Sequence, residues 1–343
     1  MPSLLSIRGL KKYFPLPKPH LFSKETPYLR AVENVSLDVR VGETYGLVGE
    51  SGCGKSTLGR TLLQLQKATA GEVVYYEDGE KGVDLTKLTD KQMRAYRKDL
   101  QIIFQDPYSS LNPRMTVGQI IEEGVATHGF FKRGTDEMQK YVLEIMQKCG
   151  LQAHALGRYP HQFSGGQRQR VCIARALAVK PKFVVCDECV SALDVSVQAQ
   201  ILNLLQDLKA QEGLTYLFIS HDLSVVRHVA DTVGVMYLGR IVEQGNAEEI
   251  FETPLHPYTL ALISAAPSAE EEKRQGRILL SGQLPSPVFL PSGCPFHTRC
   301  FMARECCRDG DVPLVDVGNG RTVACHFAKI PTEEKRRLAQ KRE

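Results

Sequence analysis

The sequence contains no tryptophan, no large excess of charge of one sign, and no apolar stretch suited to a membrane-spanning helix. The uncharged segment 278–298 contains four prolines, and a proline inside a helix removes a hydrogen bond and breaks the helix. The segment 254–269 is too short to span a bilayer and contains three prolines. The N-terminal residues lack the basic and then apolar order of a signal peptide. We therefore expect a soluble protein that stays in the cytosol.

The overall composition is that of a globular protein. The 343 residues include 43 Lys and Arg against 39 Asp and Glu, and the resulting net charge of +4 does not by itself indicate a nucleic-acid partner. Hydrophobic residues make up 43% and charged residues 24%, which excludes a disordered chain, a collagen and a coiled-coil rod. The length predicts two domains, or one large domain with an appendage.

Strand-like runs recur through the first 245 residues, and several of them are apolar without polar alternation, as is typical of strands that are buried on both faces. They lie at residues 3–10, 44–49, 100–105, 183–188 and 215–220. Helical patterns lie between them, for example at 166–179 and 191–210. This alternation predicts an α/β domain with a parallel sheet core.

Two segments depart from the alternation. Residues 106–165 combine prolines with amphipathic helical patterns, which indicates a mainly helical insertion into the α/β core. From about residue 251 the composition shifts toward proline and cysteine, so we expect one domain at 1–250 and a small C-terminal domain at 251–343. The last residues, PTEEKRRLAQKRE, predict a solvent-exposed helix.

A glycine-rich loop follows the apolar run 44–49 and precedes a helical pattern, which is the context of a phosphate-binding loop. The loop consists of Gly49, Glu50, Ser51, Gly52, Cys53, Gly54, Lys55, Ser56 and Thr57. Its glycines let backbone N–H groups converge on phosphate oxygens at the start of the helix. We expect Lys55 to contact the β- and γ-phosphates of ATP and the Ser56 hydroxyl to bind Mg²⁺.

An acidic pair, Asp187-Glu188, ends the apolar run at 183–188. An aspartate at the end of a strand beside a phosphate loop can hold Mg²⁺ through water. The adjacent Glu188 is suited to act as the general base toward the attacking water. Taken alone, the pair also fits two solvated turn residues.

A second glycine motif, Phe163-Ser164-Gly165-Gly166-Gln167, lies upstream of the acidic pair at a predicted helix start, where anions can bind. It closely resembles the signature sequence of ATP-binding-cassette (ABC) ATPases, with Phe163 where leucine is commoner. The resemblance covers about residues 3–250. It implies a RecA-like parallel sheet core, an antiparallel β part and a helical subdomain. It also implies that Ser164, Gly165, Gly166 and Gln167 act on the ATP held by the phosphate loop of a partner subunit.

Four further residues match positions of the family. The resemblance implies that Tyr13 stacks on adenine and that Gln105 contacts Mg²⁺ and the attacking water. It further implies that Asp194 belongs to a loop that communicates across the dimer, and that His221 senses the γ-phosphate. An edge tyrosine and a structural histidine are the simpler alternatives for Tyr13 and His221. Cys189 replaces a proline that is frequent in relatives, and we expect the change to be tolerated.

Several segments resemble the dipeptide/oligopeptide importer branch of the family, in particular its DppF/OppF type of ATPase subunit. They are residues 106–115, residues 190–205 and the motif His256-Pro257-Tyr258-Thr259. The resemblance implies a peripheral protein at the cytoplasmic face of the inner membrane that powers peptide import. Nickel or oligosaccharide uptake by the same machinery remains an alternative, as does, with less support, a soluble ABC ATPase acting on nucleic acid.

The partners follow from the same resemblance. It implies a heterodimer with a second homologous ATPase subunit, two transmembrane permease subunits and an extracytoplasmic solute-binding protein. One chain alone does not separate a heterodimer from a homodimer. No nucleic-acid partner is expected.

Ten cysteines occur in the chain, and five of them lie between positions 294 and 325. In a reducing compartment, grouped cysteines indicate metal ligands before disulfides. Four thiolates of this group fit a structural metal site. They are Cys294, Cys300, Cys307 and Cys325, with Cys306 as the reserve ligand and His297 and His326 as further candidate donors. The resemblance to importer ATPases, some of which bind a [4Fe–4S] cluster at a cysteine-bearing tail, implies that the metal is such a cluster. Zinc is the alternative metal, and buried, metal-free thiols are the alternative to any metal.

Overall fold

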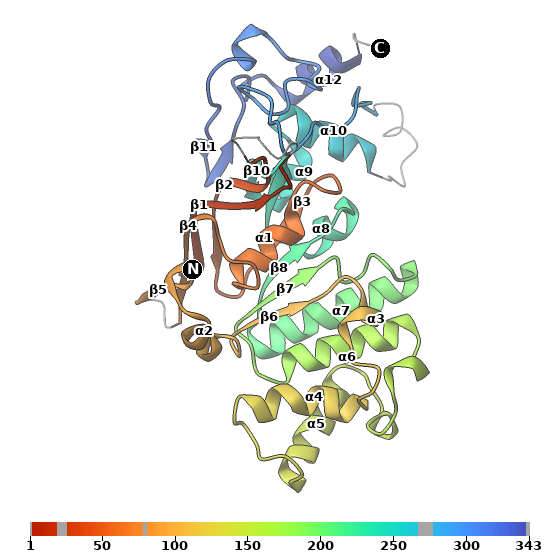
Figure 1. Cartoon of the computed structure of the whole chain (residues 1–343). Coiled ribbons are helices and arrows are strands. Elements are labelled where there is room, and N and C mark those ends of the chain that lie inside the picture. Colours follow the sequence, from red (N-terminus) through yellow and green to blue (C-terminus); the bar gives the residue numbers. More distant parts are fainter. Residues whose placement is uncertain (1, 19–25, 78–80, 267–276, 341–343) are drawn as a thin grey trace. The chain divides into compact units, whose positions relative to one another are not determined.

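The computed structural model describes residues 2–18, 26–77, 81–266 and 277–340. The chain divides into two compact units (Figure 1). The phosphate-loop unit comprises Pro2–Val39, Thr44–Thr86 and Ser220–Glu343. The signature unit comprises Arg40–Glu43 and Lys87–Ile219.

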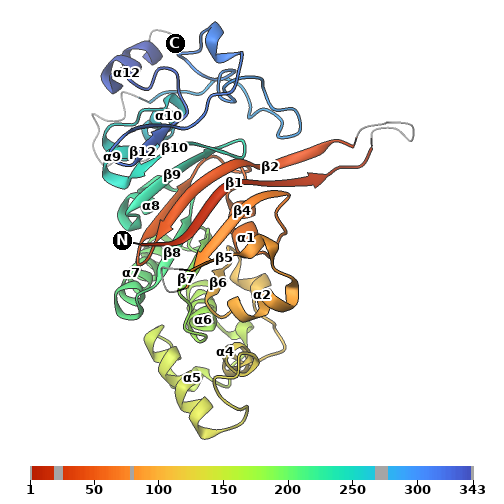
Figure 2. The same cartoon turned by 90° about the vertical axis from the view of Figure 1, so that its left-hand side faces the viewer.

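One sheet of the phosphate-loop unit has the strand order β2-β1-β4-β5. Its strands are β1 (Ser3–Pro15), β2 (Tyr28–Arg40), β4 (Ala70–Tyr76) and β5 (Gly82–Asp84). β1 and β4 pair antiparallel with Leu5 opposite Tyr75, and β4 and β5 are also antiparallel. Figure 2 shows β1 and β2 as two long strands that run side by side. This sheet supplies the antiparallel β part of the fold.

The same unit contains the strands β3 (Thr44–Val48), β9 (Thr232–Tyr237), β10 (Arg240–Asn246), β11 (Val315–Gly318) and β12 (Arg321–Val323). β3 and β9 pair in parallel, whereas β9, β10, β12 and β11 follow one another antiparallel. All five residues of β3 are buried, which explains why its sequence is apolar without alternation. The helices of the unit are α1 (Lys55–Leu62), α8 (Leu223–Val229), α9 (Ala247–Glu252), α10 (Pro257–Ala265) and α12 (Thr332–Gln340).

The prediction of a solvent-exposed terminal helix is wrong in part. α12 forms as expected, but Lys335 is fully buried and its amine donates a hydrogen bond to the Ala328 carbonyl at 3.1 Å. Burial lowers the pKa of Lys335. Ala339 packs in a cluster with Leu260, Ala261 and Ile278. The charged sequence of α12 predicts exposure on all sides, but one face of the helix is buried. A lysine can be buried there because a carbonyl oxygen accepts a hydrogen bond from its amine.

The signature unit contains three parallel strands, β6 (Leu100–Ile103), β7 (Phe183–Asp187) and β8 (Thr215–Ile219), paired in the order β6-β7-β8. Its helices are α2 (Asp90–Tyr96), α3 (Pro107–Ser110), α4 (Val117–Thr127), α5 (Asp136–Lys148), α6 (Gly165–Leu177) and α7 (Val195–Glu212). α7 begins at Val195 and not at 191, because Asp194 has the extended backbone of an N-cap residue. It ends before Gly213, which adopts the left-handed conformation.

The predicted α/β fold is confirmed, with parallel strands, an antiparallel part and helical segments. The boundary near residue 250 and the helical insertion at 106–165 stay predictions. Within the described ranges, no helix combines the length and the apolar character needed to cross a bilayer.

Candidate functional site

The phosphate loop joins β3 to α1 in the phosphate-loop unit, and glycine is required at two of its positions. A Cβ atom on Gly49 would lie 2.2 Å from the Met236 carbonyl oxygen, and one on Gly54 would lie 2.0 Å from the Ala31 carbonyl oxygen. Gly54 also has a φ of +109°, which side chains disfavour. The neighbouring backbone therefore requires glycine at positions 49 and 54, independently of any ligand.

Lys55 is the first residue of α1 and only 4% exposed. Its amine donates hydrogen bonds to the carbonyl oxygens of Gly49 at 2.8 Å and Glu50 at 3.0 Å. The two carbonyl oxygens thus hold the amine against the loop, and its positive charge is already in position for a phosphate oxygen. Cys53 is buried beneath, and burial raises the pKa of its thiol.

Two other predicted residues lie in the same unit. The Tyr13 hydroxyl donates to Glu33 Oε2 at 2.7 Å, and partial burial together with this bond raises the pKa of Tyr13 to about 12. Its ring lies 5.8 Å from the Arg30 guanidinium. His221 is exposed and directly precedes Asp222, which caps the start of α8.

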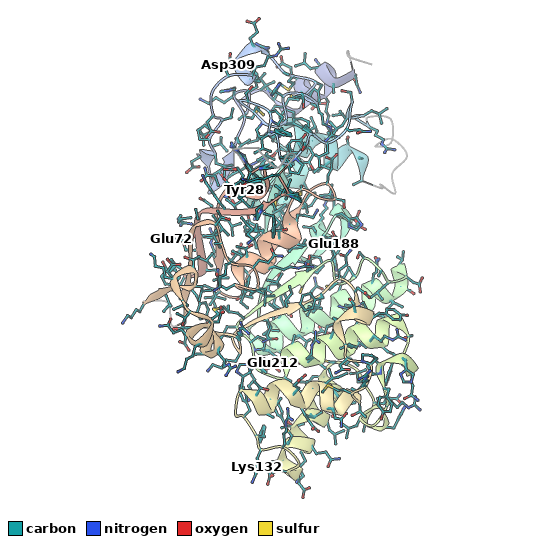
Figure 3. All side chains as sticks on the ribbon, viewed as in Figure 1. Tyr28, Glu72, Lys132, Glu188, Glu212 and Asp309 are labelled. Atoms are coloured by element: carbon teal, nitrogen blue, oxygen red, sulfur yellow. The ribbon has the colours of Figure 1, made fainter. Side chains whose placement is uncertain are left out.

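The signature unit brings Gln105 and Glu188 together (Figure 3 labels Glu188). The Gln105 amide donates to Glu188 Oε2 at 2.8 Å. Asp187, the last residue of β7, is fully buried. Glu188 has a φ of +48°, which is uncommon for a residue with a side chain and is typical of functional turns. Cys189, at the position of the frequent proline, is buried.

The signature motif forms the start of α6. Ser164 is the N-cap: its hydroxyl accepts from the Gln167 backbone at 3.4 Å, and the Gln167 side chain accepts from the Ser164 backbone at 3.1 Å. A Cβ atom on Gly166 would lie 2.4 Å from a methyl group of Val197. Gly166 therefore allows α6 to pack closely against α7. Asp194, the N-cap of α7, is exposed.

The sequence reasoning missed two contacts of the signature segment. The Arg168 guanidinium stacks over the Tyr108 ring at 3.7 Å, and its Nε donates to the Pro160 carbonyl at 2.7 Å. Arg168 is buried although it is charged. The only sequence signal was its position directly after the motif, since an arginine in a helix usually faces solvent.

The four predicted cysteine ligands line one small pocket in the phosphate-loop unit, of about 20 Å³. These are Cys294, Cys300, Cys307 and Cys325, and they are joined there by His256, His297, His326 and Phe296. Cys306 is exposed and does not line the pocket. Burial raises the pKa of Cys300 to about 12 and that of Cys325 to about 11.

The expected metal centre is not formed in the structure. Among the residues that the structure describes, no group of three or more His, Cys, Asp or Glu has the arrangement of a metal site. The pocket has room for about one water molecule, so that its thiols would have to separate to admit a cluster. Neither an iron–sulfur cluster nor zinc is supported by the arrangement of the side chains alone.

Comparison with known proteins agrees with this geometry. The family model "ABC transporter" matches residues 32–191. The solved structure "Dimeric structure of a post-hydrolysis state of the ATP-binding cassette MJ0796 bound to ADP and Pi" superposes with a TM-score of 0.61 at 28% identity, covering 71% of this chain and 98% of that one. Fold, phosphate loop and signature motif define an ABC ATPase, an enzyme that hydrolyses ATP with Mg²⁺.

The relatives narrow the class. The "Oligopeptide transport ATP-binding protein AppF" of Bacillus subtilis (strain 168) is 47% identical over 329 residues, covering 95% of this chain and 97% of that protein. The "Dipeptide transport ATP-binding protein DppF" of Escherichia coli (strain K12) is 48% identical over 322 residues, covering 94% and 93%. The family model "Oligopeptide/dipeptide transporter, C-terminal region" matches residues 242–307. The chain belongs to the family of oligopeptide and dipeptide transport ATP-binding proteins, as the sequence motifs predict.

Proposed function

We propose that this protein is the ATP-hydrolysing subunit that powers import of dipeptides or oligopeptides through a membrane ABC transporter. The observation that carries the proposal is that one chain matches both the ABC transporter model and the peptide-transporter C-terminal model. Relatives named for oligopeptide and dipeptide transport align with 94–95% of the chain. The similarity therefore includes the C-terminal segment and is not limited to the ATPase motifs.

In the proposed reaction, the loop from Gly49 to Thr57 binds the phosphates of ATP. Lys55 neutralises charge on the β- and γ-phosphates, while Ser56 and Asp187 hold Mg²⁺. A water oxygen attacks the γ-phosphorus, its proton passes to the Glu188 carboxylate, and the bond to the ADP oxygen breaks.

The surrounding residues orient this reaction. Gln105 donates a hydrogen bond to Glu188 and so fixes the direction of the carboxylate. We assign to Gln105 the second role of contacting Mg²⁺ and the water, and to His221 contact with the γ-phosphate. Tyr13 is assigned to the adenine ring and Asp194 to communication between subunits.

The reaction is tested by replacing Glu188 with Gln, which keeps the shape of the side chain and removes its basicity. We expect Glu188→Gln to lower the turnover of the assembled transporter by about 10²- to 10³-fold while ATP affinity stays within about twofold. The matched control is Glu212→Gln, which removes only a surface pair with Lys148 and should leave turnover unchanged. Normal hydrolysis by the Glu188 variant would exclude Glu188 as the general base.

We infer that ATP closes a dimer with a second homologous ATPase subunit, in which Ser164, Gly165, Gly166 and Gln167 contact the ATP of the partner. The exposed start of α6 supports this, as does the dimeric form of the similar solved cassette. Two permease subunits and an extracytoplasmic solute-binding protein would complete the system. The protein would then lie peripherally at the cytoplasmic face of the inner membrane.

The transported solute is tested with the complete system in proteoliposomes. ATP-dependent uptake of a labelled dipeptide or oligopeptide is expected, with nickel ions and an oligosaccharide as the competing solutes. Uptake of nickel or oligosaccharide without peptide would overturn the peptide assignment. Failure of the chain to associate with any permease, together with salt-sensitive nucleic-acid binding, would overturn the transporter function.

We further propose that residues 251–343 form a C-terminal domain in which Cys294, Cys300, Cys307 and Cys325 bind a [4Fe–4S] cluster, with zinc as the competing metal. The grouping of the four cysteines in the sequence, together with their place around one pocket, is the reason for this proposal, and Cys307 is preferred to Cys306 because Cys306 does not line that pocket. Four thiolates are the usual donors of such a cluster, which would cross-link residues 294–325 of this segment.

The cluster is tested on the full chain purified without oxygen. Iron and sulfide are expected at about four each per chain. Both should be lost in Cys300→Ser, but retained in Cys306→Ser and in Cys149→Ser. Stoichiometric zinc without iron would favour zinc, and the absence of both would leave four buried thiols.

A further inference from the structure

The side chain of Glu50, in the phosphate loop, is held by an arginine from the far end of the chain. Arg299 Nη1 and Nη2 donate to Glu50 Oε2 and Oε1 at 2.7 and 3.0 Å. The Arg299 side chain is 8% exposed and that of Glu50 is 28% exposed. Two parallel hydrogen bonds between a guanidinium and a carboxylate fix both distance and direction. The Glu50 carboxylate raises the pKa of Arg299 above its ordinary value.

The backbone of Glu50 is held by the same region. Its N–H donates to the Tyr258 hydroxyl at 2.9 Å. The Tyr258 ring lies 5.3 Å from the ring of Phe296, which is buried and also meets Tyr237 edge-on at 5.2 Å. Phe296 and Arg299 both belong to residues 294–300, the cysteine loop, which begins and ends with a cysteine. One short loop therefore fixes Glu50 through its side chain and, by way of Tyr258, through its main chain.

The position of Glu50 bears directly on the nucleotide site. Its carbonyl oxygen accepts a hydrogen bond from the Lys55 amine at 3.0 Å. A displacement of Glu50 would therefore move both the loop backbone and the acceptor that orients Lys55. A shift of the phosphate-binding groups by a fraction of an ångström lowers the affinity for phosphate, because the site is then no longer preformed and part of the binding free energy is spent on rearranging it.

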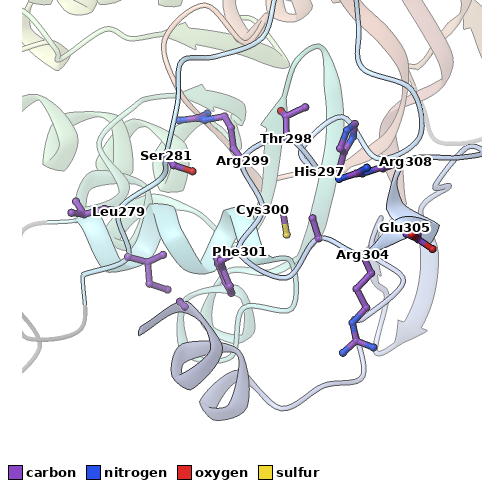
Figure 4. Close-up of a pocket in the computed structure, with 13 residues that line it drawn as sticks. Leu279, Ser281, His297, Thr298, Arg299, Cys300, Phe301, Arg304, Glu305 and Arg308 are labelled. Carbon is purple, nitrogen blue, oxygen red and sulfur yellow. The ribbon is translucent and has the colours of Figure 1, made fainter. Parts of the chain in front are cut away.

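The cysteine loop is not tightly packed on all sides. Thr298, Arg299 and Cys300 of this loop line a cavity of about 830 Å³ (Figure 4). Phe296 and Cys300 also line the pocket that holds the four cysteines. Side chains next to a cavity have fewer packing partners, so the ion pair with Glu50 and the ring contacts of Phe296 are two of the contacts that hold the loop in place.

We propose that Arg299 is a positioning residue of the nucleotide site: by holding Glu50, it makes the conformation of the phosphate loop, and hence the affinity for ATP–Mg²⁺, depend on the cysteine loop. This inference rests on nucleotide binding by the phosphate loop, and on no transported solute or bound metal. Arg299 and Glu50 lie 249 positions apart in sequence, and Arg299 belongs to no nucleotide motif.

The test is a double-mutant cycle on the full chain, read by calorimetric titration with ATP–Mg²⁺. We expect Arg299→Gln and Glu50→Gln each to raise the Kd by about tenfold, and the double variant to bind no more weakly than the weaker single one. Arg299→Lys keeps the positive charge but loses the two parallel hydrogen bonds of the guanidinium, so its affinity for ATP–Mg²⁺ should lie between those of the wild type and Arg299→Gln. Asp311→Asn is the matched control, because it removes another arginine–carboxylate pair of this unit, Arg240–Asp311, and should leave the Kd unchanged.

A purely structural role would lower the melting temperature without changing the Kd. In the assembled transporter, we expect the KM for ATP to rise in Arg299→Gln while kcat at saturating ATP stays within about twofold. An unchanged Kd in folded Arg299→Gln, fully additive effects in the cycle, or an equal loss in Asp311→Asn would each overturn the proposal. If Arg299→Gln does not fold, an unchanged Kd in Glu50→Gln would overturn it equally.

Discussion

The two glycine motifs of this chain each lead into a helix, but the two helix starts are built differently. α1 follows Gly54, which has a left-handed backbone, and within the described residues no side chain caps it. α6 follows Ser164, whose hydroxyl forms a reciprocal capping box with Gln167. The first start also has the buried Lys55 as its first helical residue, whereas the second has two glycines.

Because of this difference, the two helix starts are expected to bind a phosphate group in different ways. A helix start leaves several backbone N–H groups without partners inside the helix. In the phosphate loop, rigid glycines and a lysine are arranged so that phosphate oxygens can satisfy those groups. In the signature motif, Ser164 already accepts one of them, so that a phosphate has to compete with an existing cap. We therefore expect the phosphate loop to bind ATP in the isolated chain and the signature motif to contribute only when a second subunit presents its nucleotide.

The largest expected effect is that of breaking the phosphate loop. Gly54→Ala would bring a methyl group against the Ala31 carbonyl oxygen at a φ of +109°. Because that oxygen is backbone and cannot turn aside, the loop must shift. We expect the Kd of the isolated chain for ATP–Mg²⁺ to rise by about a hundredfold or more, which corresponds to a loss of about 2.7 kcal/mol.

A matched control separates this clash from the general cost of a positive φ. Gly213, at the end of α7, has a φ of +67° with no atom near the added Cβ position. Gly213→Ala should reduce the free energy of unfolding by about 1 kcal/mol and leave the Kd unchanged. A Gly54→Ala chain that is folded by circular dichroism and binds ATP normally would show that the loop is not the nucleotide site.

The next effect concerns the signature motif. Gly166→Val should leave ATP binding to the isolated chain within about twofold, since the motif is expected to act on the ATP of the partner. It should abolish ATP-driven dimerisation, measured by sedimentation with the non-hydrolysing Glu188→Gln background. Loss of ATP affinity in the isolated chain would contradict the separation of the two helix starts.

Gly166→Val also disturbs the contact between α6 and α7, because the added Cβ meets Val197. The double variant Gly166→Val/Val197→Ala makes room on that side. If it regains stability but still does not dimerise, the surface of the motif matters as well as its packing. If it dimerises, the effect of Gly166→Val was one of packing alone.

The sequence was most informative where a motif is local and least informative where charged groups are buried by distant segments. The phosphate loop and β7 were predictable because glycine spacing and unbroken apolar runs follow from backbone sterics and two-sided burial. The Arg299–Glu50 pair was not, because each residue alone is typical of a solvated surface. Lys335 was misjudged for the same reason. The convergence of the cysteines was predictable from their grouping, but the size of their pocket was not.

The smallest effect tests the cap of the signature helix by a comparison within the same unit. Ser164 with Gln167 at the start of α6 and Thr116 with Gln119 at the start of α4 form the same capping box. Ser164→Ala and Thr116→Ala should each lower the free energy of unfolding by about 1 kcal/mol, because each leaves a backbone N–H without its acceptor.

Only Ser164→Ala should also affect catalysis. In the assembled transporter, it removes a hydroxyl that we expect to contact the partner's ATP, and a hydrogen bond to a charged group is worth about 1.5–3 kcal/mol. We therefore expect its ATP hydrolysis rate to fall by about tenfold or more, with Thr116→Ala near the wild-type rate. Equal rates in two variants of equal stability would mean that the Ser164 hydroxyl only caps its own helix and takes no part in ATP hydrolysis.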